Sequence, residues 1–170
     1  TLEKNNMFII PLDNERVWYR YHHLFADLLK QRLQYKGKDE IQELHNKASN
    51  WFEQSKMYNY SIEHALKIYN YEKALKLLGE TAEYLWETGH HSAIINYGEL
   101  IPDEIIKKNI EFFLYYSLIL ISSRKNQKAE PFLLSAEKNT RLIINNKDSS
   151  KRAIERHKKL LGKIANQLFT

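Results

Sequence analysis

Residues 71–89, with the sequence YEKALKLLGETAEYLWETG, decide the fold class of this chain. Small and aliphatic side chains recur there at steps of three and four residues, at Ala74, Leu77, Leu78, Ala82 and Leu85. This spacing places them on one face of an α-helix, where they can be buried together. Gly89 follows and readily adopts the left-handed conformation in which many helices end. The stretch therefore predicts an amphipathic helix over residues 71–88.

The same spacing recurs on both sides of this stretch and predicts helices along most of the chain. We expect them over residues 21–34, 39–52, 60–68, 91–100, 110–122, 127–139 and 150–168. Asp39 is the expected cap of the second helix, and Pro131 is tolerable only near a first turn. The first helix carries one apolar stripe, made of Tyr21, Leu24, Phe25, Leu28, Leu29 and Leu33. Because the connections are short, neighbouring helices should pack as antiparallel hairpins.

The first twenty residues have a different pattern. Residues 7–10 and 17–19 are β-prone runs, and residues 11–15 between them supply turn-forming side chains. Two such runs around a short turn are typical of a β-hairpin. The sequence thus predicts an all-α fold that is preceded by one short hairpin.

Composition excludes several classes of protein. Cysteine is absent, so the chain has neither disulfides nor thiolate metal sites, and its composition fits a reducing cytoplasm. The apolar run 112–121 is shorter than the roughly 20 residues of a membrane span, so we expect a buried helix and no membrane partner. A net charge of +5 permits contact with nucleic acid but indicates it only weakly. The chain opens without an initiator methionine or a signal peptide, so we expect a piece of a longer cytoplasmic protein.

Residues 70–78 resemble the opening of the second helix of a tetratricopeptide repeat. Similar spacing returns at Asn126, Ala129, Leu133 and Ala136, and more loosely over residues 89–101. The last two copies are roughly 36 residues apart, against a repeat period of about 34. We therefore expect a divergent, TPR-like superhelical array. Such arrays usually present a concave binding surface.

Two segments at the start of the chain carry a family resemblance. Residues 2–13, LEKNNMFIIPLD, and residues 18–29, WYRYHHLFADLL, are similar to the junction after the winged helix in MalT-like ATP-dependent regulators of the LuxR family. Residues 44–52, 65–66, 71–74, 88–90 and 99–104 resemble later family segments, and from Lys107 onward the likeness is architectural. Tyr69 departs from the pattern, because the family usually has a small turn residue there.

The resemblance implies a division into two domains and a regulatory role. Residues 1–35 would be the end of a winged-helix domain, with its β-hairpin and exit helix, and residues 36–170 the first part of a TPR-like sensor array. That array would receive a small-molecule inducer or a regulatory protein and relay the event to a STAND-type NTPase module. No phosphate-binding loop and no helix-turn-helix is evident, so ATP and DNA would bind regions outside this chain. Self-association is a further expected option. We place the relay junction at Trp18, Tyr21 and Phe25.

Catalytic and metal-binding readings of the sequence are weak. His22 and His23 are adjacent, so on a helix they point about 100° apart and chelate one ion poorly. His90 and His91 follow Gly89 in a turn, where a solvated role is favoured over pH sensing. The glutamates are dispersed and the serines lack a nucleophile motif, so we expect no enzyme and no cofactor in this chain.

Aromatic and basic residues offer two candidate binding surfaces. Trp51, Tyr58 and Trp86 are candidate groove aromatics, although aromatic residues at helical spacing are more often part of the core. Arg152, Arg156, Lys159 and Lys163 form a basic stripe on the last expected helix, for which a solvated face is favoured over contact with an acidic partner or RNA. Besides the regulatory segment, two alternatives stay open. One is a generic TPR-like adaptor that binds a peptide or protein, and the other is a helical enzyme or RNA-binding unit that uses the basic last helix.

Overall fold

The stretch that decides the fold class is helical, as its spacing predicts. Helix α4 (Tyr71–Glu87) buries Ala74, Leu75, Leu77, Leu78, Gly79, Ala82 and Leu85. Asn70 caps its start, because the side chain of Asn70 accepts a hydrogen bond from the backbone N–H of Lys73 at 3.2 Å. At its other end Gly89 has φ +76°, the left-handed conformation that the sequence predicts there.

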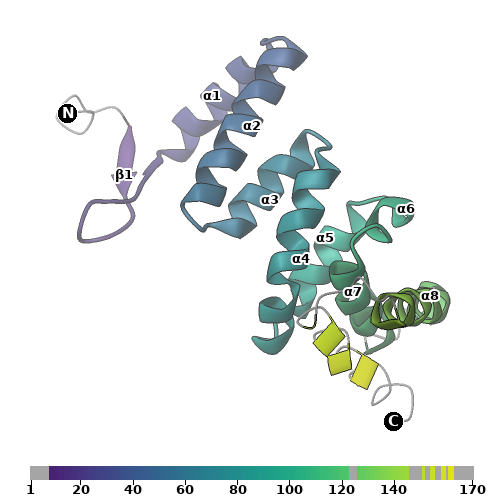
Figure 1. Cartoon of the computed structure of the whole chain (residues 1–170). Coiled ribbons are helices and arrows are strands. Elements are labelled where there is room, and N and C mark those ends of the chain that lie inside the picture. Colours follow the sequence, from purple (N-terminus) through teal and green to yellow (C-terminus); the bar gives the residue numbers. More distant parts are fainter. Residues whose placement is uncertain are drawn as a thin grey trace. The chain divides into compact units, whose positions relative to one another are not determined.

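The structure is a computed structural model that describes residues 8–122, 126–145, 151, 154–155, 158–159 and 161–162. Besides α4, its elements are β1 (Ile9–Pro11), β2 (Tyr19–Tyr21), α1 (His23–Gln34), α2 (Lys38–Gln54), α3 (Tyr58–Lys67), α5 (His91–Glu99), α6 (Asp103–Ile106), α7 (Ile110–Ser122) and α8 (Asn126–Asn145) (Figure 1). The chain forms two compact units, residues 1–45 and 46–170, and the boundary falls within α2. The predicted functional division, 1–35 and 36–170, stays a prediction.

The first unit holds the predicted β-hairpin. Strands β1 and β2 pair antiparallel, with Ile9 opposite Tyr21 and Pro11 opposite Tyr19. The carboxylate of Asp13 orders the turn, because it accepts hydrogen bonds from the backbone N–H groups of Val17 at 2.9 Å and Trp18 at 3.1 Å. The predicted first helix began too early, because Tyr21 lies in β2 and α1 begins at His23. The apolar stripe on α1 therefore lacks Tyr21, and no residue of α1 is buried.

One capping prediction was wrong. Helix α2 begins at Lys38, so Asp39 lies within the first helical turn and is not the cap. The position is favourable for a different reason. Asp39 and Glu40 place negative charge at the positive end of the helix dipole.

Helix α7 is the centre of the second unit. Every residue from Phe112 to Leu120 is buried, as expected for its apolar run. The helix packs against α8, α4 and α5. The rings of Phe113 and Phe132 meet edge to face at 5.2 Å between centroids, which joins α7 to α8. Gly98 lets α5 approach α7, since a Cβ at that position would lie 2.3 Å from the ring of Tyr116.

Close packing also joins α2 to α3. The hydroxyl of Ser49 donates to the carbonyl of Ser61 at 2.9 Å, and the hydroxyl of Ser61 donates to the carbonyl of Ser49 at 2.8 Å. Both serines are fully buried. Two small polar side chains thus satisfy each other where the helices cross.

Three successive corners of the array have the same backbone geometry. Each is a three-residue connection whose middle residue is left-handed: Lys56 (φ +58°), Tyr69 (φ +57°) and Gly89 (φ +76°). In each corner two N–H groups bond back to helix carbonyls at 2.8 to 3.1 Å, from Lys56 to Glu53 and Met57 to Phe52, from Tyr69 to Leu66 and Asn70 to Ala65, and from Gly89 to Trp86 and His90 to Leu85. This pair of bonds is the Schellman motif.

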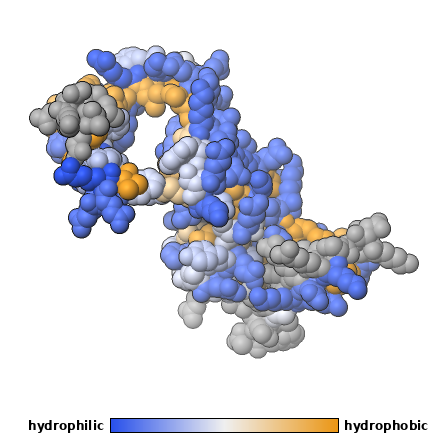
Figure 2. Space-filling model, turned by 60° about the vertical axis from the view of Figure 1, so that its left-hand side comes forward, coloured by the Kyte–Doolittle hydropathy of each residue, from blue (hydrophilic) through white to orange (hydrophobic). Residues whose placement is uncertain are grey.

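The remaining predicted boundaries differ in detail. Helix α6 was not predicted, and α8 extends to Asn145 with Pro131 inside it and not in its first turn. The predicted helix 150–168 lies largely outside the described residues, as do the side chains of Asn126, Ala129 and Ala136. No helix in the described part of the chain is long and apolar enough to cross a membrane. The visible face is mostly hydrophilic, with hydrophobic residues in separate clusters (Figure 2).

Candidate functional site

The most exposed part of an otherwise packed corner is the side chain of Tyr69. Tyr69 lies in the connection between α3 and α4, and 74% of its surface is exposed. Its ring meets the ring of Tyr71 edge to face, with 6.1 Å between centroids. A left-handed backbone costs a residue with a Cβ about 1–2 kcal/mol, and Tyr69 carries that cost at φ +57°. An exposed aromatic side chain at a strained position is a reason to look for a binding role.

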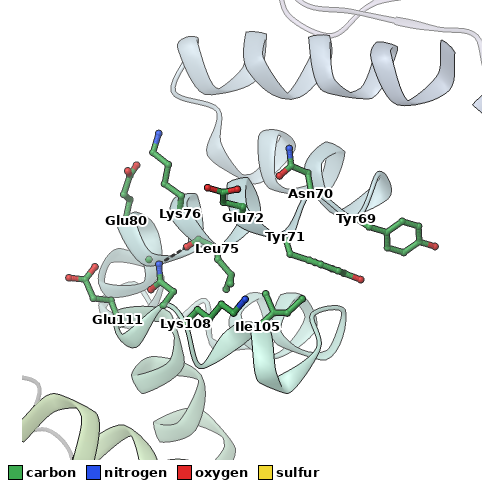
Figure 3. A pocket seen from close by; sticks show the side chains of 12 residues that line it. Tyr69, Asn70, Tyr71, Glu72, Leu75, Lys76, Glu80, Ile105, Lys108 and Glu111 are labelled. Atoms are coloured by element: carbon green, nitrogen blue, oxygen red, sulfur yellow. Dashed lines mark hydrogen bonds between the residues drawn. The ribbon is translucent and has the colours of Figure 1, made fainter. Parts of the chain in front are cut away.

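Tyr69 borders a wide hollow in the second unit. This hollow measures about 850 Å³ and lies between α4 and the segment that runs from α6 into α7. In Figure 3, Tyr71 and Leu75 point from α4 toward the segment that carries Ile105 and Lys108, and Tyr69 lies at one end. The volume falls within the range of small-molecule and peptide sites.

Charged side chains follow one row of α4 along the edge of this hollow. Glu72, Lys76 and Glu80 are four residues apart, so they share one face of the helix (Figure 3). The ammonium group of Lys76 is held by Glu53 of α2 at 3.1 Å. Lys73 contacts the other carboxylate oxygen of Glu53 at 3.0 Å. On this row of α4 the two carboxylates of Glu72 and Glu80 flank the single ammonium group of Lys76, and the charge of Glu80 also acts on Lys76.

The same ion pairs shift two pKa values. Hydrogen bonds from Lys73 and Lys76 lower the pKa of Glu53, so this carboxyl group stays ionised. The Glu53 carboxylate raises the pKa of Lys76. Both charges are fixed near neutral pH, and together they hold the end of α2 against α4.

Asn109 lines the same hollow and joins two helices beside it. Its amide nitrogen donates to the carbonyl of Leu75 at 2.9 Å, and its amide oxygen accepts from the N–H of Phe112 at 3.0 Å. One side chain thus caps the start of α7 and bonds to the backbone of α4. Gly79 makes this possible, because a Cβ there would lie 2.6 Å from the Asn109 amide nitrogen.

A smaller hollow lies on the other side of Tyr69. It measures about 340 Å³ and is lined by Glu63, Leu66, Lys67, Tyr69, Tyr97 and Leu100. Burial, together with the charge of Glu63, raises the pKa of Tyr97, so its phenol stays protonated. Leu100 is 61% exposed and gives this hollow an apolar wall. We call the two hollows, with the Tyr69 side chain that borders both, the Tyr69 groove.

Two of the three predicted relay residues lie together in the first unit. The ring of Phe25 stacks on Phe8 and meets Tyr21 edge to face, each at 5.4 Å between centroids. Trp18 is half exposed, and its backbone is bonded within the hairpin turn. The relay itself stays a prediction.

The three predicted groove aromatics have different neighbours, and their binding role stays a prediction. Trp51 is 52% exposed and packs on Phe52 of the same helix. Tyr58 borders a separate hollow of about 310 Å³, and Trp86 stacks on His91 at 4.9 Å. The aromatic pair beside the larger of the two hollows, Tyr69 and Tyr71, was missed as a candidate site. Alignment of the three corners by their left-handed residue would have found it, since tyrosine stands at the position of Gly89.

The histidines and the last helix have ordinary contacts. His22 and His23 stack on each other at 4.3 Å, and no group of residues in the described part of the chain could hold a metal ion. The ring nitrogen of His90 bonds to the hydroxyl of Thr88 at 2.8 Å. Within the basic stripe Lys159 pairs with Glu83 at 2.9 Å, whereas Arg152, Arg156 and Lys163 lie outside the described residues.

The fold places this chain in the class of helical-array proteins, with a short antiparallel hairpin at the amino-terminal end. The comparisons with known proteins name that hairpin segment. Residues 1–41 match the MalT winged helix domain, which supports a MalT-like segment.

Similarity to curated proteins extends further along the chain. This chain is 26% identical over 104 residues to the serine/threonine-protein kinase PknK of Mycobacterium tuberculosis and of Mycobacterium bovis. The match covers 61% of this chain and 9% of each of those proteins. No solved structure matches significantly. These findings fit a regulatory segment with a winged-helix tail and a helical array.

Proposed function

We propose that this chain is a non-catalytic sensing and protein-interaction segment of a MalT-like, LuxR-family transcription regulator. The observation that carries the proposal is the winged-helix match at residues 1–41, followed directly by a helical array with an open groove. In this proposal the Tyr69 groove receives the signal, and an NTPase module outside this chain binds ATP. Contact with DNA belongs to another region.

The mechanism would be allosteric. A ligand shifts an equilibrium only by the difference in its affinity for two arrangements. The groove suits such a difference, since α4 bonds to α7 through Asn109 and to α2 through Glu53. A ligand that fits one spacing of these helices better would favour that spacing. We assign the onward relay to the junction of Trp18, Tyr21 and Phe25.

Substitution of the junction tests this proposal. Trp18→Ala and Phe25→Ala are introduced together into the longer regulator, and transcription from its promoter is measured with and without the inducing condition. Loss of the Phe25 contacts to Phe8 and Tyr21 should reduce the induced level, while circular dichroism should show the helical array intact. Leu142→Ala, which removes an exposed side chain on α8, is the matched control. A folded double variant that is fully inducible would exclude the junction from the relay.

A generic peptide- or protein-binding adaptor is the second candidate. It is favoured by the similarity to PknK, because a protein named as a serine/threonine kinase carries a related segment in a different context. The two candidates differ in what accompanies the chain. An NTPase module before it and a DNA-binding module after it would exclude the adaptor.

A further inference from the structure

Tyr69 occupies a position that its backbone makes unfavourable. The three Schellman corners hold lysine, tyrosine and glycine at the same left-handed position, and glycine alone adopts it without penalty. The Tyr69 ring does not repay the cost by burial, since the side chain is 74% exposed. Its ring contact with Tyr71 lies at 6.1 Å. The structure therefore gives the Tyr69 side chain a conformational cost and little packing benefit.

The surroundings of Tyr69 suit a ligand that extends across the Tyr69 side chain, not one that is enclosed in a single hollow. Hollows of about 850 and 340 Å³ lie on its two sides, and both are open to solvent. A ligand in contact with both must pass over the exposed tyrosine ring. An extended peptide can do so while it places alternate side chains on either side.

Charge distinguishes which peptide fits. The chain as a whole has a net charge of +5, yet four glutamates and three lysines line the two hollows. One of those lysines, Lys76, is already paired with Glu53. Glu72 and Glu80 remain on the exposed edge of the larger hollow (Figure 3). The smaller hollow adds apolar wall from Leu66 and Leu100. The lining of the groove thus has one more carboxylate than ammonium groups on a chain that is basic as a whole, and an apolar wall lies beside it.

We propose that the Tyr69 groove binds an extended peptide segment that carries a basic side chain next to an apolar one. The basic group lies in the larger hollow near Glu72 and Glu80, and the apolar group lies against Leu100. The Tyr69 ring packs between them, with its face available to the cation. This inference rests on the proposed role of the groove as the receiving surface, and it names the class of partner that the groove accepts.

Binding of synthetic peptides to the 170-residue chain tests the inference. The probe is a short fluorescent peptide with two Lys-Leu pairs in a glycine–serine background, and anisotropy reports its Kd. Matched peptides with Glu-Leu or Lys-Ser pairs, and free spermidine as competitor, separate charge from apolar contact. We expect the Lys-Leu peptide to bind best and to weaken with added salt. The net charge of +5 opposes non-specific binding of this probe.

Four variants locate the site. Tyr69→Gly should weaken binding about tenfold, because an aromatic contact of this kind is worth about one decade of affinity, while Tm stays equal or rises. Tyr69→Phe retains the ring and should bind normally. Lys56→Gly relieves the same backbone conformation at another corner, and Tyr84→Ala removes another exposed tyrosine of α4, so both should leave Kd unchanged.

Several results would overturn the inference. Equal binding of the Glu-Leu peptide, displacement by spermidine alone, or an unchanged Kd in Tyr69→Gly would each do so. The outcome is also separable from the regulatory proposal. If the chain does not bind these peptides, but substitution of Trp18 and Phe25 abolishes induction in the longer regulator, then the peptide inference is wrong and the relay proposal stands.

Discussion

The change in free energy of unfolding caused by Gly79→Ala should reverse its sign when Asn109 is replaced by alanine. Asn109 makes two hydrogen bonds, one that caps α7 and one to the Leu75 carbonyl of α4. Removal of a cap costs about 1 kcal/mol, and loss of a neutral hydrogen bond costs about 1 kcal/mol more. Asn109→Ala should therefore lower the free energy of unfolding by about 2 kcal/mol.

Gly79→Ala has opposite effects in the two backgrounds. With Asn109 present, the new Cβ lies 2.6 Å from the amide nitrogen and 2.7 Å from the amide oxygen. The amide can move away only by losing its hydrogen bonds, so the clash costs about 2 kcal/mol against a gain of about 1 kcal/mol in helix propensity. In the Asn109→Ala background the obstacle is gone, and the propensity gain of about 1 kcal/mol should appear in full.

Urea unfolding, followed by helical circular dichroism, measures all four corners of the cycle. We expect Gly79→Ala to destabilise the wild type by about 1 kcal/mol and to stabilise Asn109→Ala by about 1 kcal/mol. Gly37→Ala, where no atom lies within 4 Å of the new Cβ, is the control, and its effect should be the same in both backgrounds. If Gly79→Ala were equally destabilising in both backgrounds, the contact with Asn109 would not be the reason for glycine at position 79.

Three further results should follow from contacts in the second unit. Gly98→Ala should cost about 1–3 kcal/mol in urea unfolding, because the Tyr116 ring would lie 2.3 Å from the new Cβ and is itself buried; equal stability would show that the two helices separate freely. Ser49→Ala should cost about 1 kcal/mol, and the added cost of Ser61→Ala in that background should be smaller than alone, since the two hydroxyl oxygens lie 3.1 Å apart and share one buried contact; strict additivity would contradict this. Glu53→Gln should cost at most about 0.5 kcal/mol near neutral pH, because the ion pairs are partly exposed. The pKa of Glu53 in the folded chain is lowered from its ordinary value of 4.5, so the stability that its carboxylate contributes is present above pH 4.5 and is lost as the pH falls through the folded pKa. The melting temperatures of wild type and Glu53→Gln should therefore converge in acid. A difference that stays constant with pH would contradict the assignment.

Local pattern was sufficient for most of the helices but not for the site. Helices α4 and α7 each have a strong apolar signal within one segment, and Gly89 marks the end of α4 by its own chemistry. Helix α6 spans only residues 103–106, too short for a periodic signal. The cap of α2 was predicted two residues too late, at Asp39, since capping chemistry and first-turn chemistry favour the same side chain.

The Tyr69 groove depends on distant parts of the chain. Its larger hollow is bounded by residues 69–80 on one side and 105–111 on the other. The bond from Asn109 to Leu75 spans 34 residues, a pairing that spacing within one helix cannot indicate. The sequence does flag Tyr69 as unusual for a turn. Only the left-handed backbone and the two hollows explain why that choice matters.

The Schellman corners have a practical consequence for protein engineering. Main-chain groups alone supply the two hydrogen bonds at each corner, so the middle side chain contributes nothing to the closure. Lysine, tyrosine and glycine already occupy equivalent places in one molecule. New functional groups could be grafted at these places, with a penalty limited to local dihedral energy, and the helical scaffold would keep its register. At these three positions the side chain can therefore be changed while the backbone hydrogen bonds that close the corner are kept.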